Sequence, residues 1–240
     1  MGYCELYGYF YIYVKIGLYK IITISYNDIM YLYLAIGISI LLLVWTIGSY
    51  VAISNIEEPT YTVLENHDSY EIREYAPYII AEAEVSGNYN EASRAGFRLI
   101  ADYIFGNNTS QSSIAMTTPV LQKQSEKIAM TIPVITNFSD SENQKVSFVL
   151  PSEYTIDTLP TPNNSQVMIV EVPSYTAAVR RFSWYTTAER VQKQINSLLQ
   201  VLDRDDKVAI SSPSVARYNP PLSMPLILRN EIIIQVDQSI

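Results

Sequence analysis

Two residue types that build metal and catalytic centres are almost absent from this chain of 240 residues. It has one cysteine, Cys4, and one histidine, His67. A single cysteine excludes a disulfide within the chain and a metal site built from several thiolates. A single histidine excludes a site built from several imidazoles. The sequence also has no nucleophile elbow and no glycine-rich phosphate loop.

Positive charge is scarce as well. The chain has 16 Lys and Arg against 24 Asp and Glu, a net charge of −8. The four charged residues within residues 1–56 sum to zero, so the excess negative charge belongs to the remainder of the chain. Because an acidic domain is a poor partner for a phosphate backbone, we expect no nucleic-acid partner.

One long apolar run is present near the beginning of the chain. Residues 31–53 contain no charged side chain, and these 23 residues suffice to cross roughly 30 Å of hydrocarbon at about 1.5 Å per residue. Aromatic residues lie toward both ends of the run, as in a membrane-interface belt. This pattern favours a transmembrane helix over a buried core helix. A cleaved signal peptide is the rival interpretation, since Ala52-Ile53-Ser54 has the small-x-small form of a cleavage site.

The charges that flank the apolar run predict its orientation. Lys15 and Lys20 precede it, whereas Glu57 and Glu58 follow it. The positive-inside rule then places the N-terminus in the cytoplasm. We therefore expect a single-pass membrane protein whose soluble domain lies on the non-cytoplasmic side.

Composition divides the chain into three parts. Residues 1–29 form a tyrosine-rich segment without a motif, and it is absent if translation starts at Met30 and not at Met1. In that case the two lysines that support the orientation are also lost. Residues 30–56 form the membrane anchor or signal peptide, and residues 57–240 form the soluble domain.

A seven-residue phrase occurs twice in the soluble domain. Ile114–Val120 and Ile128–Val134 differ only at their fifth position, and each copy ends in Pro-Val. Proline removes a backbone donor and biases the preceding residue toward extended geometry. We predict two short strands that stop or kink at Pro119 and Pro133 and pair like a hairpin.

Period-two and helical patterns predict the remaining elements. In Tyr78–Val85 the odd-numbered residues are apolar and are expected to face the core. A helix capped by Asn88 or Asn90 is expected to end at Gly106. The capping box Thr186-x-x-Glu189 predicts the start of a second helix. Further strands are expected at 61–64, 70–75, 146–150, 167–172, 175–182, 216–219 and 230–236.

The order strand, strand, helix, strands occurs twice. An offset of 97 residues places Tyr78 on Tyr175, although few residues are identical. We predict an α+β fold made of two pseudo-repeats whose sheets join side by side, each carrying one helix. Clefts between a helix and the strand loops are where small ligands bind.

Several segments together resemble the SOUL haem-binding protein family. The doubled phrase carries the resemblance, with Tyr70–Tyr75, Gly96–Asn107, Arg217–Pro221 and Arg229–Ile232. The resemblance spans about residues 60–236. It implies a pseudo-two-fold, distorted antiparallel β-barrel with two helices, here preceded by one transmembrane helix. It also implies non-covalent binding of haem or a related tetrapyrrole.

The resemblance also points to a set of candidate binding residues. Arg94 and Arg98 lie on the helix that flanks the family's proposed haem groove, and they are candidates to clamp two propionates. An exposed face with an Arg98–Asp102 pair is the alternative. For the methionines, core packing competes with iron ligation. The complete candidate set is Arg94, Arg98, Ala101, Met116, Lys123, Lys127 and Met130.

An axial histidine is not expected. Some family members are proposed to use a histidine just before the last tyrosine of the Tyr-Glu-Ile-Arg-x-Tyr strand, and here that position is Glu74. His67 lies in a polar turn and is interpreted as a solvated side chain, with iron ligation as the alternative. Binding would then rest on apolar burial, propionate pairing, or a Met or Tyr ligand.

These observations predict a membrane-anchored domain that binds haem as a buffer or carrier and is not a catalyst. A hydrolase or tetrapyrrole-modifying enzyme that uses the same cleft is the first alternative. A membrane-proximal interaction module is the second.

Overall fold

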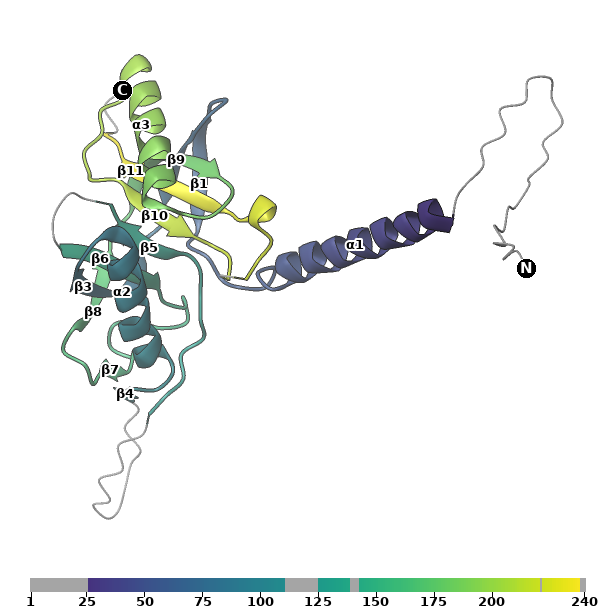
Figure 1. Ribbon diagram of the computed structural model, residues 1–240. Coiled ribbons are helices and arrows are strands. Elements are labelled where there is room, and N and C mark those ends of the chain that lie inside the picture. Colours follow the sequence, from purple (N-terminus) through teal and green to yellow (C-terminus); the bar gives the residue numbers. More distant parts are fainter. Residues whose placement is uncertain (1–25, 111–124, 139–142, 221, 238–240) are drawn as a thin grey trace, which may run out of the picture. The chain divides into compact units, whose positions relative to one another are not determined.

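The computed structural model describes residues 26–110, 125–138, 143–220 and 222–237 (Figure 1). The chain divides into two compact units, Met1–Gly48 and Ser49–Ile240. Among the described residues, the second unit contains all the strands and the helices α2 and α3, so the architecture is α+β as predicted.

Helix α1 spans Tyr26–Val51, and it contains most of the predicted apolar run. Its most apolar window has a mean hydropathy of 2.2, and none of that window is buried. The helix is therefore long and apolar enough to cross a membrane, a property that a signal sequence near an N-terminus shares.

Nine antiparallel strands form one sheet in the order β1-β2-β9-β11-β10-β5-β6-β3-β8. A separate pair joins β4 to β7. The bounds are β1 Tyr61–Asn66, β2 Glu71–Tyr75, β3 Tyr78–Ser86, β4 Asn108–Thr109, β5 Val134–Asn137, β6 Asn143–Val149, β7 Thr161–Pro162, β8 Val167–Val172, β9 Tyr175–Phe182, β10 Ser214–Arg217 and β11 Asn230–Gln235.

The sheet is a curled half-barrel, which corrects the prediction of a barrel. Strands β1 and β8 lie at its two ends and do not pair with each other in the described part of the chain. A closed barrel has no free edges, whereas this sheet keeps two.

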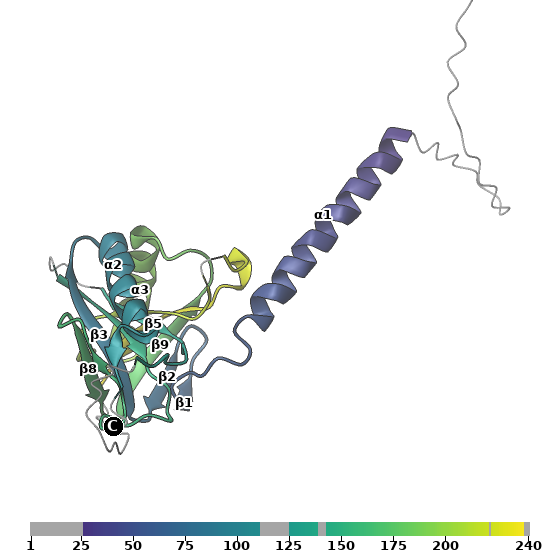
Figure 2. The same cartoon turned by 90° about the horizontal axis from the view of Figure 1, so that it is seen from below.

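Two helices cover one face of the sheet (Figure 2). Helix α2 spans Tyr89–Ile104 and packs on β3 and β6, and helix α3 spans Ala188–Arg204 and packs on β9 and β11. The predicted inward residues Ala81 and Ala83 are fully buried beneath α2. A third apolar cluster lies on the opposite face, since Val179 and Ile233 alternate with residues beneath α3.

The caps of α2 agree with the prediction, while the cap of α3 differs. Asn88 and Glu91 form a reciprocal capping box at the start of α2, and Gly106 follows its end with a φ of +119°. Helix α3 begins one residue later than predicted. Its N-cap is Thr187, whose hydroxyl accepts a hydrogen bond from the Arg190 amide, so the predicted Thr186 capping box is wrong.

The second copy of the doubled phrase does not form the predicted strand. Residues 128–133 lie outside the sheet, and β5 begins at Val134, after the proline. The backbone donors of this segment bond elsewhere: Ile128 donates to the Ile104 carbonyl and Ile132 to the Glu57 carbonyl. The first copy, Ile114–Val120, lies outside the described residues, so only its strand stays a prediction, while the predicted pairing of two strands is wrong for the second copy.

The segment between α1 and β1 is tied to the domain. Ile53 and Ile56 pack on the third cluster, and Glu58 pairs with Arg229 at 2.8 Å. These contacts add to the bond between the Glu57 carbonyl and Ile132. The segment therefore belongs to the packed structure and is more than a linker.

A candidate ligand-binding groove beside helix α2

A groove of about 430 Å³ lies where α2, the β9–α3 loop and the β10–β11 loop meet. Three segments that are far apart in sequence build it: residues 90–97, 185–187 and 217–230, with Val134 between them. The lining residues are Asn90, Arg94, Phe97, Val134, Tyr185, Thr186, Thr187, Arg217, Asn219, Pro220, Leu228 and Asn230.

The charged residues of the groove are two arginines, Arg94 and Arg217. Among the described residues no carboxylate lines it, although the chain carries a net charge of −8. Phe97, Val134 and Leu228 supply an apolar wall. The groove therefore combines an apolar surface with positive charge, which suits an amphipathic anion.

Helix α2 explains how Arg94 and Phe97 reach the groove. They lie three residues apart, on the flank of the amphipathic helix beside its buried stripe. Phe97 is held by Phe148, with ring centroids 5.2 Å apart. Arg94 is exposed, so its guanidinium is available to a ligand at the mouth of the groove.

Two buried donors in the groove lack a hydrogen-bond partner. They are Arg217 Nε and Asn219 Nδ2. Arg217 Nη2 donates to Thr136 Oγ1 at 3.1 Å, and Asn219 Oδ1 accepts from the Arg229 amide at 2.6 Å. The other end of each side chain is thus fixed, while these two N–H groups stay unpaired.

An exposed aromatic pair, Trp184 and Tyr185, precedes helix α3, and Tyr185 lines the groove. Trp184 has a φ of +79°, a conformation that residues with a side chain rarely adopt. Its amide donates to the Pro225 carbonyl at 3.0 Å, and its carbonyl accepts from Asn230 Nδ2 at 2.8 Å. These bonds hold the strained turn and present Trp184 and Tyr185, which are 41% and 48% exposed.

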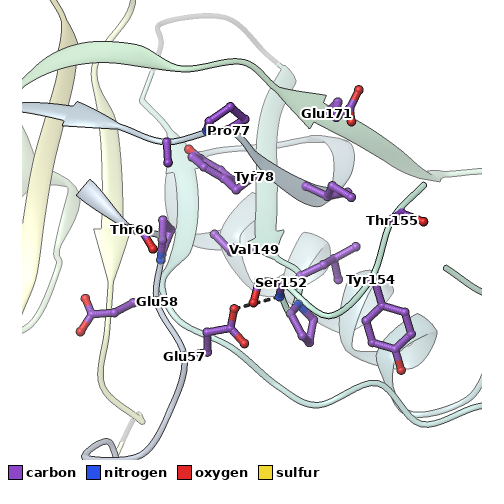
Figure 3. A pocket seen from close by; sticks show the side chains of 15 residues that line it. Glu57, Glu58, Thr60, Pro77, Tyr78, Val149, Ser152, Tyr154, Thr155 and Glu171 are labelled. Carbon is purple, nitrogen blue, oxygen red and sulfur yellow. Dashed lines mark hydrogen bonds between the residues drawn. The ribbon is translucent and has the colours of Figure 1, made fainter. Parts of the chain in front are cut away.

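A second pocket of about 500 Å³ has the opposite charge (Figure 3). Glu57, Glu58 and Glu171 line it, and no described lysine or arginine does. Figure 3 shows Glu57 and Glu171 on opposite sides, with Glu57 accepting a hydrogen bond from the Ser152 amide at 2.8 Å. This acidic pocket would repel a dianionic ligand.

Comparison with known proteins agrees with the sequence motifs. The family model described as SOUL heme-binding protein matches residues 56–235. This chain belongs to the SOUL haem-binding family. The match covers both helices of the sheet and the entire groove.

Similar proteins and structures place the chain in the same family and fold. Heme-binding protein 2 of Homo sapiens is 32% identical over 158 residues, which cover 65% of this chain and 73% of that protein. Heme-binding protein 1 of Xenopus laevis is 27% identical over 165 residues, covering 68% and 82%. The crystal structure of the EcmrR C-terminal domain has a TM-score of 0.50 at 10% identity, covering 75% of this chain and 99% of that one. That likeness concerns the fold alone.

The binding residues that the SOUL resemblance suggests do not all lie in one pocket. Arg94 lines the groove, whereas Arg98 and Ala101 of the same helix do not. Lys127 and Met130 are exposed and line neither pocket. Met116 and Lys123 lie outside the described residues.

His67 lies in the β1–β2 turn, as expected, and its side chain is 34% exposed. Its Nε2 lies 2.9 Å from Glu65 Oε2, and its ring stacks on Tyr70 with centroids 4.4 Å apart. It lines neither pocket. Within the described ranges, no group of three or more His, Cys, Asp or Glu side chains could hold a metal ion.

Sequence reasoning missed Arg217, Asn219 and Tyr185 as groove residues. Arg217 and Asn219 belong to a segment that carries the family resemblance, so the motif contained a signal. Its role was not evident because the groove forms only when this segment meets α2.

Proposed function

We propose that the Ser49–Ile240 unit binds haem or a related tetrapyrrole non-covalently in the groove between α2 and the β10–β11 loop, as a buffer or carrier. The observation that carries this proposal is the lining of the groove, which joins an apolar wall to Arg94 and Arg217 without a described carboxylate. The family relationship supports it, because the relatives compared above are named heme-binding proteins.

The two chemical parts of haem match the two parts of the groove. The macrocycle is a flat apolar surface, and its burial against Phe97, Val134 and Leu228 is favourable by roughly 25 cal/mol per Å². The propionates carry two negative charges, which pair with arginines. The acidic pocket has no described lysine or arginine that could pair with the propionates.

The iron would find an unusual ligand. Among the described lining residues, Tyr185 is the one whose side chain is known as an axial haem ligand in proteins. It stands on the rigid turn that begins at Trp184. We therefore assign Tyr185 as the ligand of ferric iron in this proposal.

Membrane anchoring is part of the same proposal. Residues 31–53 would hold the ligand-binding domain, residues 57–240, at the membrane on its non-cytoplasmic side. The length and composition of α1 support the anchor, and Lys15 and Lys20 support the orientation. The strand order supports a pseudo-two-fold arrangement. If β2 corresponds to β8, β3 to β9, β5 to β10 and β6 to β11, the order of these eight strands is the same when it is read from either end of the sheet.

A titration of the full chain with haemin tests the function. We expect a saturable one-to-one change of the Soret absorbance that is weakened when Arg94 is replaced by glutamate. A variant of the acidic pocket, Glu171→Gln, serves as the control and should bind as the wild type does. The proposal fails if no saturable change occurs, or if the Arg94 variant binds haemin unchanged.

A further inference from the structure

The two unpaired donors of the groove have no role within the folded chain. Leaving a buried donor without a partner costs about 1–3 kcal/mol. Arg217 Nε and Asn219 Nδ2 both carry this cost, and both line the same groove. Native proteins satisfy most buried polar groups, so two unpaired donors in one groove indicate a missing acceptor.

We infer that Arg217 and Asn219 form a carboxylate-binding subsite at the inner end of the groove. Both groups are donors, and one of them belongs to a permanent cation. A carboxylate offers two acceptor oxygens in one plane and accepts two donors at once. A ligand amide or hydroxyl group would fit less well than a carboxylate. Each brings a donor of its own, and the described lining has no charged acceptor for it. The identity of the ligand rests on the proposed function, whereas the subsite rests on these contacts.

The subsite predicts how a ligand is oriented in the groove and which ligands the groove prefers. One carboxylate is held deep in the groove by Arg217 and Asn219, and a second one meets Arg94 at the mouth. A tetrapyrrole with free propionates should therefore bind better than the same macrocycle with esterified propionates. Esterification removes the negative charge and keeps the apolar surface, so the comparison isolates the contribution of the carboxylates.

Two substitutions separate the donors from the rest of the fold. Asn219→Asp retains the oxygen that accepts the Arg229 amide and replaces the unpaired N–H₂ with an oxygen. Arg217→Gln removes the charge and the Nε–H group. Arg98→Gln is the matched control, because Arg98 lies on α2 one turn beyond Arg94 and does not line the groove.

The test measures quenching of tryptophan fluorescence in the full chain, with Trp45→Phe as the background so that Trp184 reports. We expect protoporphyrin IX to bind at least about tenfold more tightly than its dimethyl ester. Asn219→Asp and Arg217→Gln should abolish that preference, while Arg98→Gln should keep it. Equal affinity for acid and ester in the wild type, or a preference that survives both substitutions, would overturn the subsite.

A second readout does not depend on tetrapyrroles. In a ¹H–¹⁵N spectrum of arginine side chains, added butyrate should shift the Nε–H signal that disappears in Arg217→Gln, and Asn219→Asp should suppress the shift. If butyrate acts in this way while haemin does not bind, the subsite stands and the proposed function fails. If haemin binds but neither butyrate nor the ester comparison shows an effect, the subsite fails and the function stands.

Discussion

Arg73 and Glu231, which are 158 residues apart in sequence, form a buried ion pair across the sheet. Arg73 Nη1 lies 3.0 Å from Glu231 Oε2, and the side chains are 5% and 0% exposed. Arg229 Nε lies 3.0 Å from the other carboxylate oxygen, and the Tyr218 hydroxyl donates to Oε2 at 2.7 Å. One carboxylate therefore links β2, β11 and the end of β10.

Removing the Glu231 charge should destabilise the domain strongly. Glu231→Gln leaves the buried Arg73 with Glu71 as its remaining carboxylate partner, and removing one partner of a buried pair costs about 3–5 kcal/mol. The free energy of unfolding, measured with urea at neutral pH, should fall by that amount. Glu171→Gln, at an exposed position, should change it little. A loss below about 1 kcal/mol for Glu231→Gln would contradict the structural role of the pair.

The same carboxylate should make stability depend on acid pH. Burial by itself would raise the pKa of Glu231, but Arg73, Arg229 and the Tyr218 hydroxyl outweigh it and hold this pKa below its usual value of 4.5. Between the two values the unfolded chain binds more protons, so stability rises with pH there. The contribution is complete above pH 4.5 and is lost as the pH falls through the lowered pKa.

The difference between wild type and Glu231→Gln measures this contribution. Urea unfolding at several pH values should show a constant difference above about pH 5 and a shrinking one as the pH falls below 4.5 and through the lowered pKa. A difference that does not change with pH would show that folding leaves the pKa of Glu231 unchanged.

Gly96 should resist replacement by alanine. A Cβ atom at this position would lie 2.5 Å from Val146 Cβ and 2.6 Å from its Cγ2. Alanine favours a helix by about 1 kcal/mol over glycine, but overpacking costs roughly 1–3 kcal/mol. We expect net destabilisation of Gly96→Ala in thermal unfolding. Combined with Val146→Ala, it should cost less than the sum of the single variants.

The two arginines of α2 should differ in their effect on haemin binding. Arg94 lines the groove and Arg98 does not. Arg94→Glu should therefore weaken the affinity by about tenfold or more, and Arg98→Glu by less than about twofold. If both variants lost the same haemin affinity in the Soret titration, the groove would not be the propionate site.

The assignment of the iron ligand is testable by spectroscopy. Tyr185→Phe should shift the Soret maximum and remove the phenolate charge-transfer band of the ferric complex, while binding of iron-free protoporphyrin stays unchanged. Thr187→Ser, a conservative change in the same loop, is the control. An unchanged ferric spectrum in Tyr185→Phe would exclude this ligand.

Local chemistry explains which parts of the fold were predictable. Asn88, Glu91 and Gly106 fix the ends of α2 through bonds within a few residues, and the alternation in β3 is a local pattern. The proline of the doubled phrase favours a strand at residues 128–133. The actual hydrogen-bond partners of this segment, the Ile104 and Glu57 carbonyls, are distant in sequence, so no local pattern reveals them. Closure of a barrel is likewise not encoded in any single strand.

The site was less predictable for the same reason. Arg94 was found because it lies on a helix that the resemblance singled out. Arg217 and Asn219 become groove residues only when β10 and its loop meet α2. Arg73 and Glu231 are 158 residues apart in sequence. No local pattern of residues therefore predicts that they pair.

The open edges of the half-barrel also affect how separate molecules meet. Strands β1 and β8 each present a row of backbone groups that an extended segment of another chain can extend into a larger sheet. Val63 and Leu64 are exposed on β1, while β8 carries Glu171 and stops before Pro173. Colloidal stability should therefore depend mainly on β1, and charge introduced at Val63 is the change that should keep concentrated solutions clear.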